Sequence, residues 1–471
     1  MKEVPQTYNG IAKKFMSTIS QMRSIRIDVV FDQYFSPSIK DCEHSRREEA
    51  TSPVSIGPNQ VRPHNFAAEL KNIQFKEALV NFFIDHWDSE DMVPFIGNKN
   101  IYVSYNKCYS YKVLNNKVIK TTEESLSREE HEEAESRIIF HICQIDFDAK
   151  VVIRCSDSDI LIILLGNMDH LNLSLNIWMN MGVGNHQRCI NINEIYRILG
   201  VSLCKALPCF HAITGCDYTP AFFRKGKVRP FKMLETSIEY QLAFQNIITD
   251  DEDILETTFI TLEKFICQMY GVKNSSDVND VRFHLISSTF QSKKSDENFD
   301  KKFRNFDSSS VPPCKAELLQ HLLRVRYVTK LWRNAHLKHP TSLSPVDSGW
   351  IINDDKYDFV WFVGDQLPST VADIIIQNDR VLEDNDNSQY DDINNSDSES
   401  EDDYDDFEDA SFFTWQDLKK NTKSKVSKNK HHANKTGGGE AIDDELNTTD
   451  LKMLDIIAPV SVESELLLIL R

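Results

Sequence analysis

The chain lacks the features of a membrane-spanning or secreted protein. No apolar run approaches the roughly 18 residues that a membrane-spanning helix needs. The first ten residues contain no apolar core of a secretory signal. The ten cysteines are scattered and include no Cys-x-x-Cys pair. We therefore expect a reducing compartment, mostly buried thiols and no membrane contact.

One group of cysteines has the residue types of a zinc site, namely Cys204, Cys209, His211 and Cys216. The residues around them are mostly apolar and are spaced as in a core helix. Buried cysteines behave as small apolar residues. We therefore favour a buried helix over a zinc site here.

Basic residues are absent from one long stretch near the C-terminus. The chain has a formal net charge of −19, and residues 383–409 contain 14 Asp and Glu but no Lys or Arg. The rest of the chain is therefore only mildly acidic, which leaves room for local basic patches. We expect the acidic stretch to be disordered. Residues 419–435 then contain seven lysines and no acid.

What is present is an alternation of strand-like and helix-like segments. The strand-like segments are 25–32, 101–113, 150–154 and 171–179, and the helix-like segments are 38–50, 66–87, 125–143 and 192–238. This alternation predicts an α/β fold with a mostly parallel sheet flanked by helices. The expected parts are an α/β domain (1–238), a mainly helical extension (239–380), an acidic disordered segment (381–410) and a Lys-rich linker and tail (411–471).

Three local details follow from the same patterns. Ser125 and Ser127 are candidate N-caps for the helix before residue 143. The polar stretch 272–310 interrupts the helical extension as a long loop. A helix from residue 314 to about 337 is expected to carry its basic residues on a solvated face, and these are Arg324, Arg326, Lys330 and Arg333.

The strongest chemical signal is Asp157 and Asp159, which follow directly on the strand-like segment 150–154. In an extended chain, residues two apart point the same way, so the two carboxylates can converge. Converging carboxylates are costly unless a cation or a proton neutralises them. Hard divalent ions such as Mg²⁺ and Mn²⁺ prefer carboxylate oxygens. A capping turn between strand and helix is the alternative interpretation of the pair.

Further acids stand at comparable places. Asp32 ends the first strand, at the sheet edge where ligands bind in open parallel sheets. Glu133 and Glu135 stand near the start of an apolar helix, and they can converge only if Glu133 lies at or before the helix start. Glu132 with Glu135 is the competing pair. Asp217 follows an apolar helix in a Gly-containing turn.

Basic residues follow two of these acids at short range. Lys40, Arg46 and Arg47 come after Asp32, and Arg224, Lys225, Lys227 and Arg229 come after Asp217. Carboxylates that hold metal, rimmed by Lys and Arg, suit a phosphodiester, because the metals activate the scissile phosphate while the cations hold flanking phosphates. An ordinary solvated surface is the alternative for both groups.

The order of these motifs resembles the flap-endonuclease branch of the PIN-like nucleases. The resemblance rests on Phe31-Asp32 with Ser38-Ile39-Lys40 and Arg46-Arg47, Glu133-Ala134-Glu135, Ser156-Asp157-Ser158-Asp159 and Gly215-Cys216-Asp217-Tyr218. The stretch from His211 to Thr219, with Phe222 to Lys227, is similar to uncharacterised, transposon-like animal proteins of this type. The match covers about residues 25–235.

The resemblance implies a Rossmann-like fold and two-metal hydrolysis of DNA or RNA. By position, Glu133, Glu135, Asp157, Asp159 and Asp217 would bind Mg²⁺ or Mn²⁺. Asp32, Lys40 and Arg46 would act in catalysis, whereas Arg47, Arg224, Lys225, Lys227 and Arg229 would bind nucleic acid.

One feature of the resembled family is missing, because no strand-borne Asp precedes residue 25. Two explanations stay open, an incomplete N-terminus or a degraded site. The second makes the chain a catalytically inactive, transposon-derived domain that binds nucleic acid or protein. We expect a nuclear location, with the lysine cluster 419–435 as import signal and the cytoplasm as the alternative. A basic protein is a candidate partner for the acidic segment.

Overall fold

The structure is a computed structural model that describes residues 4–40, 55–155, 157, 159–182, 188–290, 308–364 and 466–470. The expected helix 38–50 therefore lies mostly outside the described residues, and so do Arg46 and Arg47. The acidic segment 381–410 and the lysine cluster 419–435 also lie outside them.

The described residues form an eight-stranded sheet in the order β4-β3-β2-β1-β10-β5-β6-β7. The strands are β1 (Arg26–Val30), β2 (Asn100–Tyr105), β3 (Lys107–Leu114), β4 (Lys117–Thr122), β5 (Lys150–Arg154), β6 (Asn176–Met181), β7 (Arg188–Asn191) and β10 (Leu466–Leu470). The five central strands are parallel, and the pairs β2–β3, β3–β4 and β6–β7 are antiparallel. The α/β prediction is confirmed, but the sheet is mixed, because hairpins extend its parallel centre at both sides.

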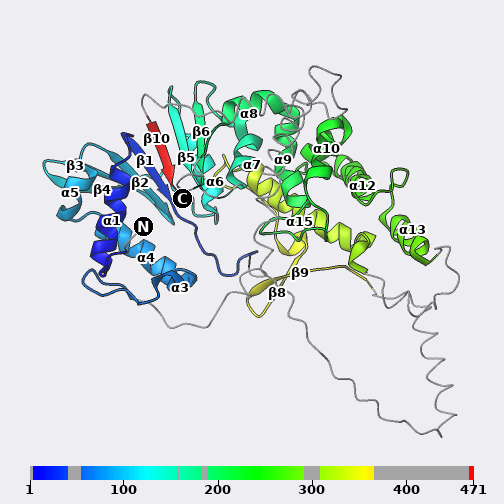
Figure 1. The fold of residues 1–471 in the computed structure, drawn as a ribbon, viewed down its shortest axis with the longest axis horizontal. Helices are drawn as coiled ribbons and strands as arrows, with labels where there is room; N and C mark the ends of the chain where they lie inside the picture. The colour runs from blue at the N-terminus through cyan, green and yellow to red at the C-terminus, as the bar shows by residue number, and fades with distance from the viewer. Residues whose placement is uncertain are drawn as a thin grey trace, which may run out of the picture.

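Strand β10 occupies the middle of this sheet. It pairs in parallel with β1 on one side, where Ile27 faces Leu468, and with β5 on the other, where Val152 faces Leu468. The sequence pattern placed these residues in the tail. In the structure they join two half-sheets (Figure 1).

The helices are those that the apolar periodicity of the sequence predicts, with a few additions. They are α1 (Tyr8–Ser20), α3 (Phe66–Glu69), α4 (Ile73–His86), α5 (Val93–Ile96), α6 (Ala134–Cys143), α7 (Asp159–Asn167), α8 (Ile192–Leu199), α9 (Val201–Ile213), α10 (Val228–Thr236), α11 (Ile238–Asn246), α12 (Glu252–Met269), α13 (Val278–Phe290) and α15 (Lys315–Arg333). A small hairpin of β8 (Trp350–Asn353) and β9 (Lys356–Phe359) follows.

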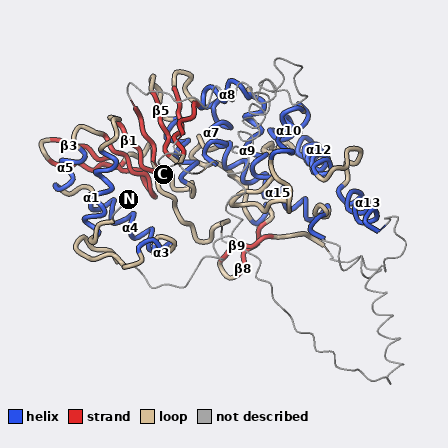
Figure 2. Tube along the Cα trace, in the orientation of Figure 1, coloured by secondary structure: helices blue, strands red, loops and turns tan. Residues whose placement is uncertain are grey.

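Helices lie on both sides of the strands (Figure 2), and two apolar cores cover the two faces of the sheet. Alternate residues of a strand point to opposite faces, and on β1 the side chains of Ile27 and Val29 pack with α1 and α4. Val30 belongs to the other core, with Val151 and Ile153 of β5 and with α6, α7 and α9. That second core continues without a break into α11, α12 and α15. The helical extension is thus packed directly on the sheet domain.

Three sequence-based details need correction. Helix α6 begins at Ala134, so Ser125 and Ser127 are not its caps, and the Ser127 hydroxyl accepts a hydrogen bond from the Cys108 amide. Helix α13 lies inside the stretch that we predicted to be a loop.

The basic face of α15 is also not solvated, as we had expected. Arg324 is 1% exposed and donates to the carbonyls of Gly349 and Val360. Lys330 is buried as well and pairs with Asp250 at 2.5 Å. Distant segments supply these partners, which a helical pattern cannot reveal.

Candidate functional site

The acidic site forms where β1 and β5 end. Because both strands are parallel, their carboxyl ends meet at one edge of the sheet. Asp32 follows β1, and Asp157 follows β5. The strand–turn–helix passage from β5 to α7 then places Asp159 in the first turn of α7.

The start of α6 is tied directly to the end of β1. The Asp32 carboxylate accepts a hydrogen bond from the amide of Ala134 at 3.0 Å, and the Gln33 amide donates to the carbonyl of Glu132 at 2.8 Å. Arg137 of α6 also donates to the carbonyl of Phe31. Asp32 therefore caps α6 and fixes the acids at the head of that helix against the sheet edge.

Glu133 stands at the N-cap position of α6, and Glu135 lies in its first turn. This is the arrangement that the sequence required for the two carboxylates to converge, because Glu133 precedes the regular helix. Glu135 is 2% exposed. Glu132, the competing residue, instead accepts a hydrogen bond from the Ser38 hydroxyl at 2.6 Å.

Lys40 lies at the centre of the acids. Its ammonium is 2.9 Å from the Glu133 carboxylate and 3.9 Å from that of Asp217. Burial alone would lower the pKa of Lys40, yet the carboxylates of Glu133, Asp217, Glu135 and Asp32 raise it well above its usual value. The lysine therefore stays protonated and offsets part of the negative charge of acids from three separate segments.

Asp217 stands in the turn after α9, at the exposed side of the site. The surrounding chain displaces part of its hydration and so raises the pKa of its carboxyl, although the side chain is 72% exposed. Asp159, Glu133 and Asp157 raise this pKa further, against the opposing effect of Lys40. This mutual influence connects the acids of α6, of the β5–α7 turn and of the α9 turn. The structure thus brings together Asp32, Lys40, Glu133, Glu135, Asp157, Asp159 and Asp217.

Asp159 is held by a short chain of buried side chains. Its Oδ1 lies 3.1 Å from Nε2 of His211, and Nδ1 of His211 lies 2.9 Å from Nζ of Lys227. Lys227 also donates to the Gly215 carbonyl at 2.8 Å. Burial opposes ionisation of Asp159, but His211, Lys227 and Lys40 together hold its pKa well below the usual range. Asp159 is therefore an anion.

Asp157 serves partly as the capping turn that we had considered. Its Oδ1 accepts a hydrogen bond from the amide of Asp159 at 3.0 Å. The two carboxylates thus differ in their surroundings, because Asp157 turns back on the start of α7 whereas Asp159 faces α9.

The basic residues after Asp217 separate into two groups. Arg224 and Arg229 are exposed, as a phosphate contact requires. Lys225 is half-buried, with its ammonium 4.2 Å from the centre of the Tyr270 ring. Lys227 is 9% exposed and contacts His211. It is therefore not available at the surface for the nucleic-acid contact that we expected.

Two residues of the site take roles that we did not predict from the sequence. His211 orients Asp159, and Trp332 of α15 donates from Nε1 to the Glu133 carboxylate at 3.0 Å. The sequence signal available for His211 was a single histidine on an apolar helix, shortly before a Gly-containing turn. Trp332 lies almost 200 residues from Glu133, and nothing local pairs them.

The donor set fits a hard divalent cation in chemical type, since it consists of carboxylate oxygens. Within the described residues, however, no three His, Cys, Asp or Glu side chains are arranged as ligands around one point. Cys204 and Cys209 are buried in the core, in line with the interpretation that we favoured over zinc.

Searches against family models, curated proteins and solved structures returned no match for this chain. None of the described helices combines the length and the apolar character needed to cross a membrane. The proposed chemistry of this chain therefore rests on the geometry of the acidic site.

Proposed function

We propose that this chain is a metal-dependent, nuclease-like protein of the PIN-like type, which hydrolyses phosphodiester bonds in DNA or RNA. The observation that carries the proposal is the convergence of acids from distant segments at the carboxyl edge of the parallel strands. Asp32 and the acids of α6, the β5–α7 turn and the α9 turn all act on Lys40 or on each other. So many carboxylates at one edge of the sheet suit a cation-dependent reaction better than a structural role.

Glu133, Glu135, Asp157, Asp159 and Asp217 would hold Mg²⁺ or Mn²⁺. Such ions, when bound, supply Lewis-acid polarisation of a phosphate. The chain's own residues prepare this chemistry. Asp32 fixes α6 through the Ala134 amide, and His211 with Lys227 keeps Asp159 ionised. Arg224 and Arg229 would contact flanking phosphates, which positions the strand without reading its sequence.

A cleavage assay tests this function. Single-stranded, flapped and duplex substrates are incubated with the full chain and MnCl₂, with chelator as the blank. We expect metal-dependent cleavage that the Asp157→Ala/Asp159→Ala double variant abolishes. Asp85→Ala is the matched control, because that side chain is 82% exposed and pairs only with Lys120 at 3.5 Å among the contacts described. Equal cleavage by the double variant would refute the proposal.

A second candidate function is binding without catalysis, and two observations favour it. Lys40 already pairs with Glu133 and lies near Asp217, which offsets part of the negative charge, and the described residues contain no group arranged as metal ligands. The chain would then be an inactive, transposon-derived domain that binds nucleic acid or protein. Fluorescence anisotropy with the same labelled substrates separates the two functions, because binding that persists in the double variant without any cleavage supports the second.

We further propose a nuclear location and a basic protein partner for the acidic segment 383–409. Both proposals rest on the charge of segments outside the described residues. Replacing the seven lysines of 419–435 by Gln in a fluorescent fusion tests the location. Unchanged nuclear accumulation would exclude this segment as the import signal.

A further inference from the structure

A small cavity opens beside the acidic site and shares Glu133 with it. Its volume is about 200 Å³, below the ~300–1,000 Å³ of sites for drug-sized ligands. Its walls come from the segment after β1, the residues before α6, the turn after α9, helix α15 and the β8–β9 hairpin. A space of this size suits a head group of a larger molecule.

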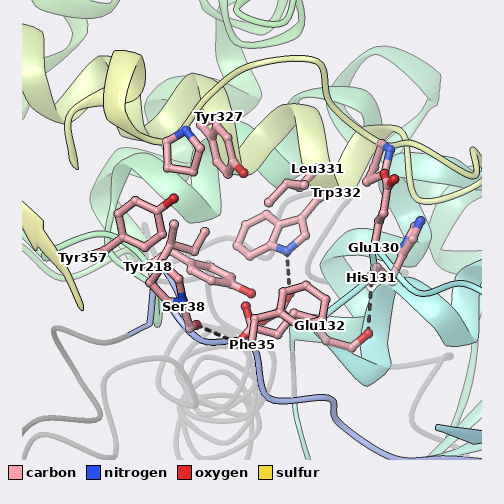
Figure 3. A pocket seen from close by; sticks show the side chains of 16 residues that line it. Phe35, Ser38, Glu130, His131, Glu132, Tyr218, Tyr327, Leu331, Trp332 and Tyr357 are labelled. Carbon is pink, nitrogen blue, oxygen red and sulfur yellow. Dashed lines mark hydrogen bonds between the residues drawn. The ribbon is translucent and has the colours of Figure 1, made fainter. Parts of the chain in front are cut away.

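Five aromatic residues are among the 16 that line the cavity. Figure 3 shows them surrounding one space, and they are Phe35, Tyr218, Tyr327, Trp332 and Tyr357. Tyr218 and Trp332 are 2% and 1% exposed and meet edge to face, with ring centres 6.2 Å apart. The Trp332 indole is fixed by its hydrogen bond to Glu133. The inner rings are therefore held in place before any ligand arrives.

Carboxylates complete the walls. Glu130, Glu132 and Glu133 all line the cavity. Glu130 lies 2.6 Å from His339 and Glu133 lies 2.9 Å from Lys40, whereas Glu132 accepts a hydrogen bond from the neutral hydroxyl of Ser38. Burial raises the pKa of Glu132 to about 7 against the effects of Ser38 and Lys40, so a bound cation would favour its ionised form. Aromatic faces attract cations through the ring quadrupole, and a nearby carboxylate adds attraction of the same sign.

A cation is already bound in this way at the edge of the cavity, between an aromatic ring and a carboxylate. The Lys40 ammonium lies 4.9 Å from the centre of the Tyr218 ring while it pairs with Glu133. One cation is thus held between an aromatic face and a carboxylate. The rings of Tyr327, Trp332 and Tyr357 line the same cavity as Glu132, so a second cation would meet the same combination of ring and carboxyl group there.

We propose that this cavity binds an alkylated ammonium head group, such as a quaternary trimethylammonium. Such a group places its methyls against the rings and its diffuse charge near Glu132, without the strong hydration of a bare ammonium. A neutral nucleobase would gain ring contact but would leave the charge of the carboxylate wall without a counterpart. This binding function does not depend on nuclease activity.

Calorimetric titration of the full chain with choline tests the proposal. The comparison ligand is the uncharged alcohol in which a carbon atom replaces the choline nitrogen, since it has the same shape without the charge. We expect choline to bind about tenfold more tightly than this alcohol. Equal affinities, no choline binding, or tighter binding of adenosine than of choline would overturn the proposal.

Variants locate the binding. Tyr357 is half-buried on the hairpin and packs only at the margin of the apolar core, so it can be replaced without removing a fully buried side chain. Tyr357→Ala should weaken choline binding about fivefold or more, and Tyr357→Phe should retain it, because the ring face is kept. Phe223→Ala is the matched control, since Phe223 is 42% exposed and does not line the cavity. Unchanged binding in Tyr357→Ala would contradict the assignment to this cavity.

Two sources could supply such a head group, and two further titrations distinguish them. A short peptide with one trimethyl-lysine should compete with choline, and the same peptide with unmodified lysine should compete more weakly. A peptide affinity above that of choline indicates a modified protein tail as the source, and one below it indicates a small molecule. Competition by the unmodified peptide that equals that of the methylated one would overturn the preference for an alkylated group.

Discussion

At the scale of single residues, Lys40 determines the charge of the acidic site. Its side chain is 15% exposed, and the Glu133 side chain that it contacts is 12% exposed. Removing one member of a buried ion pair leaves the other charge without compensation, which costs about 3–5 kcal/mol. Here the single ammonium acts on four carboxylates, so its loss affects all of them.

We predict that Lys40→Met lowers the free energy of unfolding by about 3 kcal/mol or more, and that MnCl₂ restores part of this loss. The restoration follows because the carboxylates would then bind a divalent ion in place of the ammonium. Urea denaturation with and without the metal measures both effects. Lys264→Met is the control, because its partner Glu239 is 56% exposed, and a surface pair contributes at most about 1 kcal/mol. A stable Lys40→Met variant would show that the acids do not repel each other.

Gly215 sets the turn that carries Asp217. Its φ is +108°, and an added Cβ would lie 2.6 Å from Cβ and 2.7 Å from Cα of Ala221. We predict that Gly215→Ala destabilises the fold by about 2 kcal/mol or more, because both the backbone angle and the contact with main chain oppose it. Gly226→Ala in the same loop meets no atom within 4 Å and should be nearly neutral. Thermal unfolding compares them, and equal effects would contradict this account of the turn.

The sequence predicted the acids of the site better than it predicted their partners. Asp32, Glu133 and Asp159 follow strands or begin helices, and such positions can be recognised from periodicity. Their partners come from distant parts of the chain, as Trp332 does for Glu133. A local pattern contains no information on which distant side chain will meet which acid.

At the scale of elements, β10 connects the two halves of the site. Asp32 follows β1, Asp157 follows β5, and neither strand pairs with the other, because β10 lies between them. Its backbone pairs with Arg26–Val29 on one side and with Lys150–Arg154 on the other. The distance between the acids of the two half-sheets therefore depends on this strand.

We predict that Leu468→Pro loosens β1 and β5, because proline cannot donate a ladder hydrogen bond and is poorly tolerated in central strands. Hydrogen exchange should show lost protection in both strands, with a lower unfolding temperature. Ile119→Pro on the edge strand β4 is the control, since an edge strand has one neighbour to lose. Protection of β1 and β5 equal to that of the unaltered protein would argue against β10 as a structural link.

The position of β10 could not be predicted from the sequence. Five apolar residues in a row are equally consistent with a strand, a piece of helix or a tail patch. Its partners, β1 and β5, lie hundreds of residues earlier in the chain. By contrast, α4, α9 and α15 have long apolar periodicities, and the structure confirms them. Elements with a long apolar pattern were thus predicted, whereas a short element whose partners lie far away in the sequence was not.

At the scale of the whole molecule, one core joins the sheet domain to the helical extension. Residues of α7, α9, α12 and α15 belong to the same apolar cluster. Trp332 of α15 supports Glu133, and His321 of α15 hydrogen-bonds the carbonyl of Ile213 at the end of α9. The expected boundary near residue 238 separates two regions of the sequence that share one interior, so unfolding of α15 should disturb the acidic site.

The buried His321 makes this shared core sensitive to acid. Burial and the nearby charge of Arg324 lower the pKa of His321 to about 4, against the hydrogen bond to Ile213, which raises it. The unfolded chain takes up this proton near pH 6.5, so the unfolded state binds more protons than the native state between about pH 6.5 and pH 4. Stability from this group is therefore complete above pH 6.5 and decreases as the pH falls towards 4. The difference corresponds to about 3 kcal/mol.

His321→Gln keeps a donor for the Ile213 carbonyl but cannot titrate. Urea denaturation at several pH values should show a flatter dependence for the variant than for the unaltered protein. Parallel curves would show that His321 titrates alike in both states and is not a source of acid sensitivity.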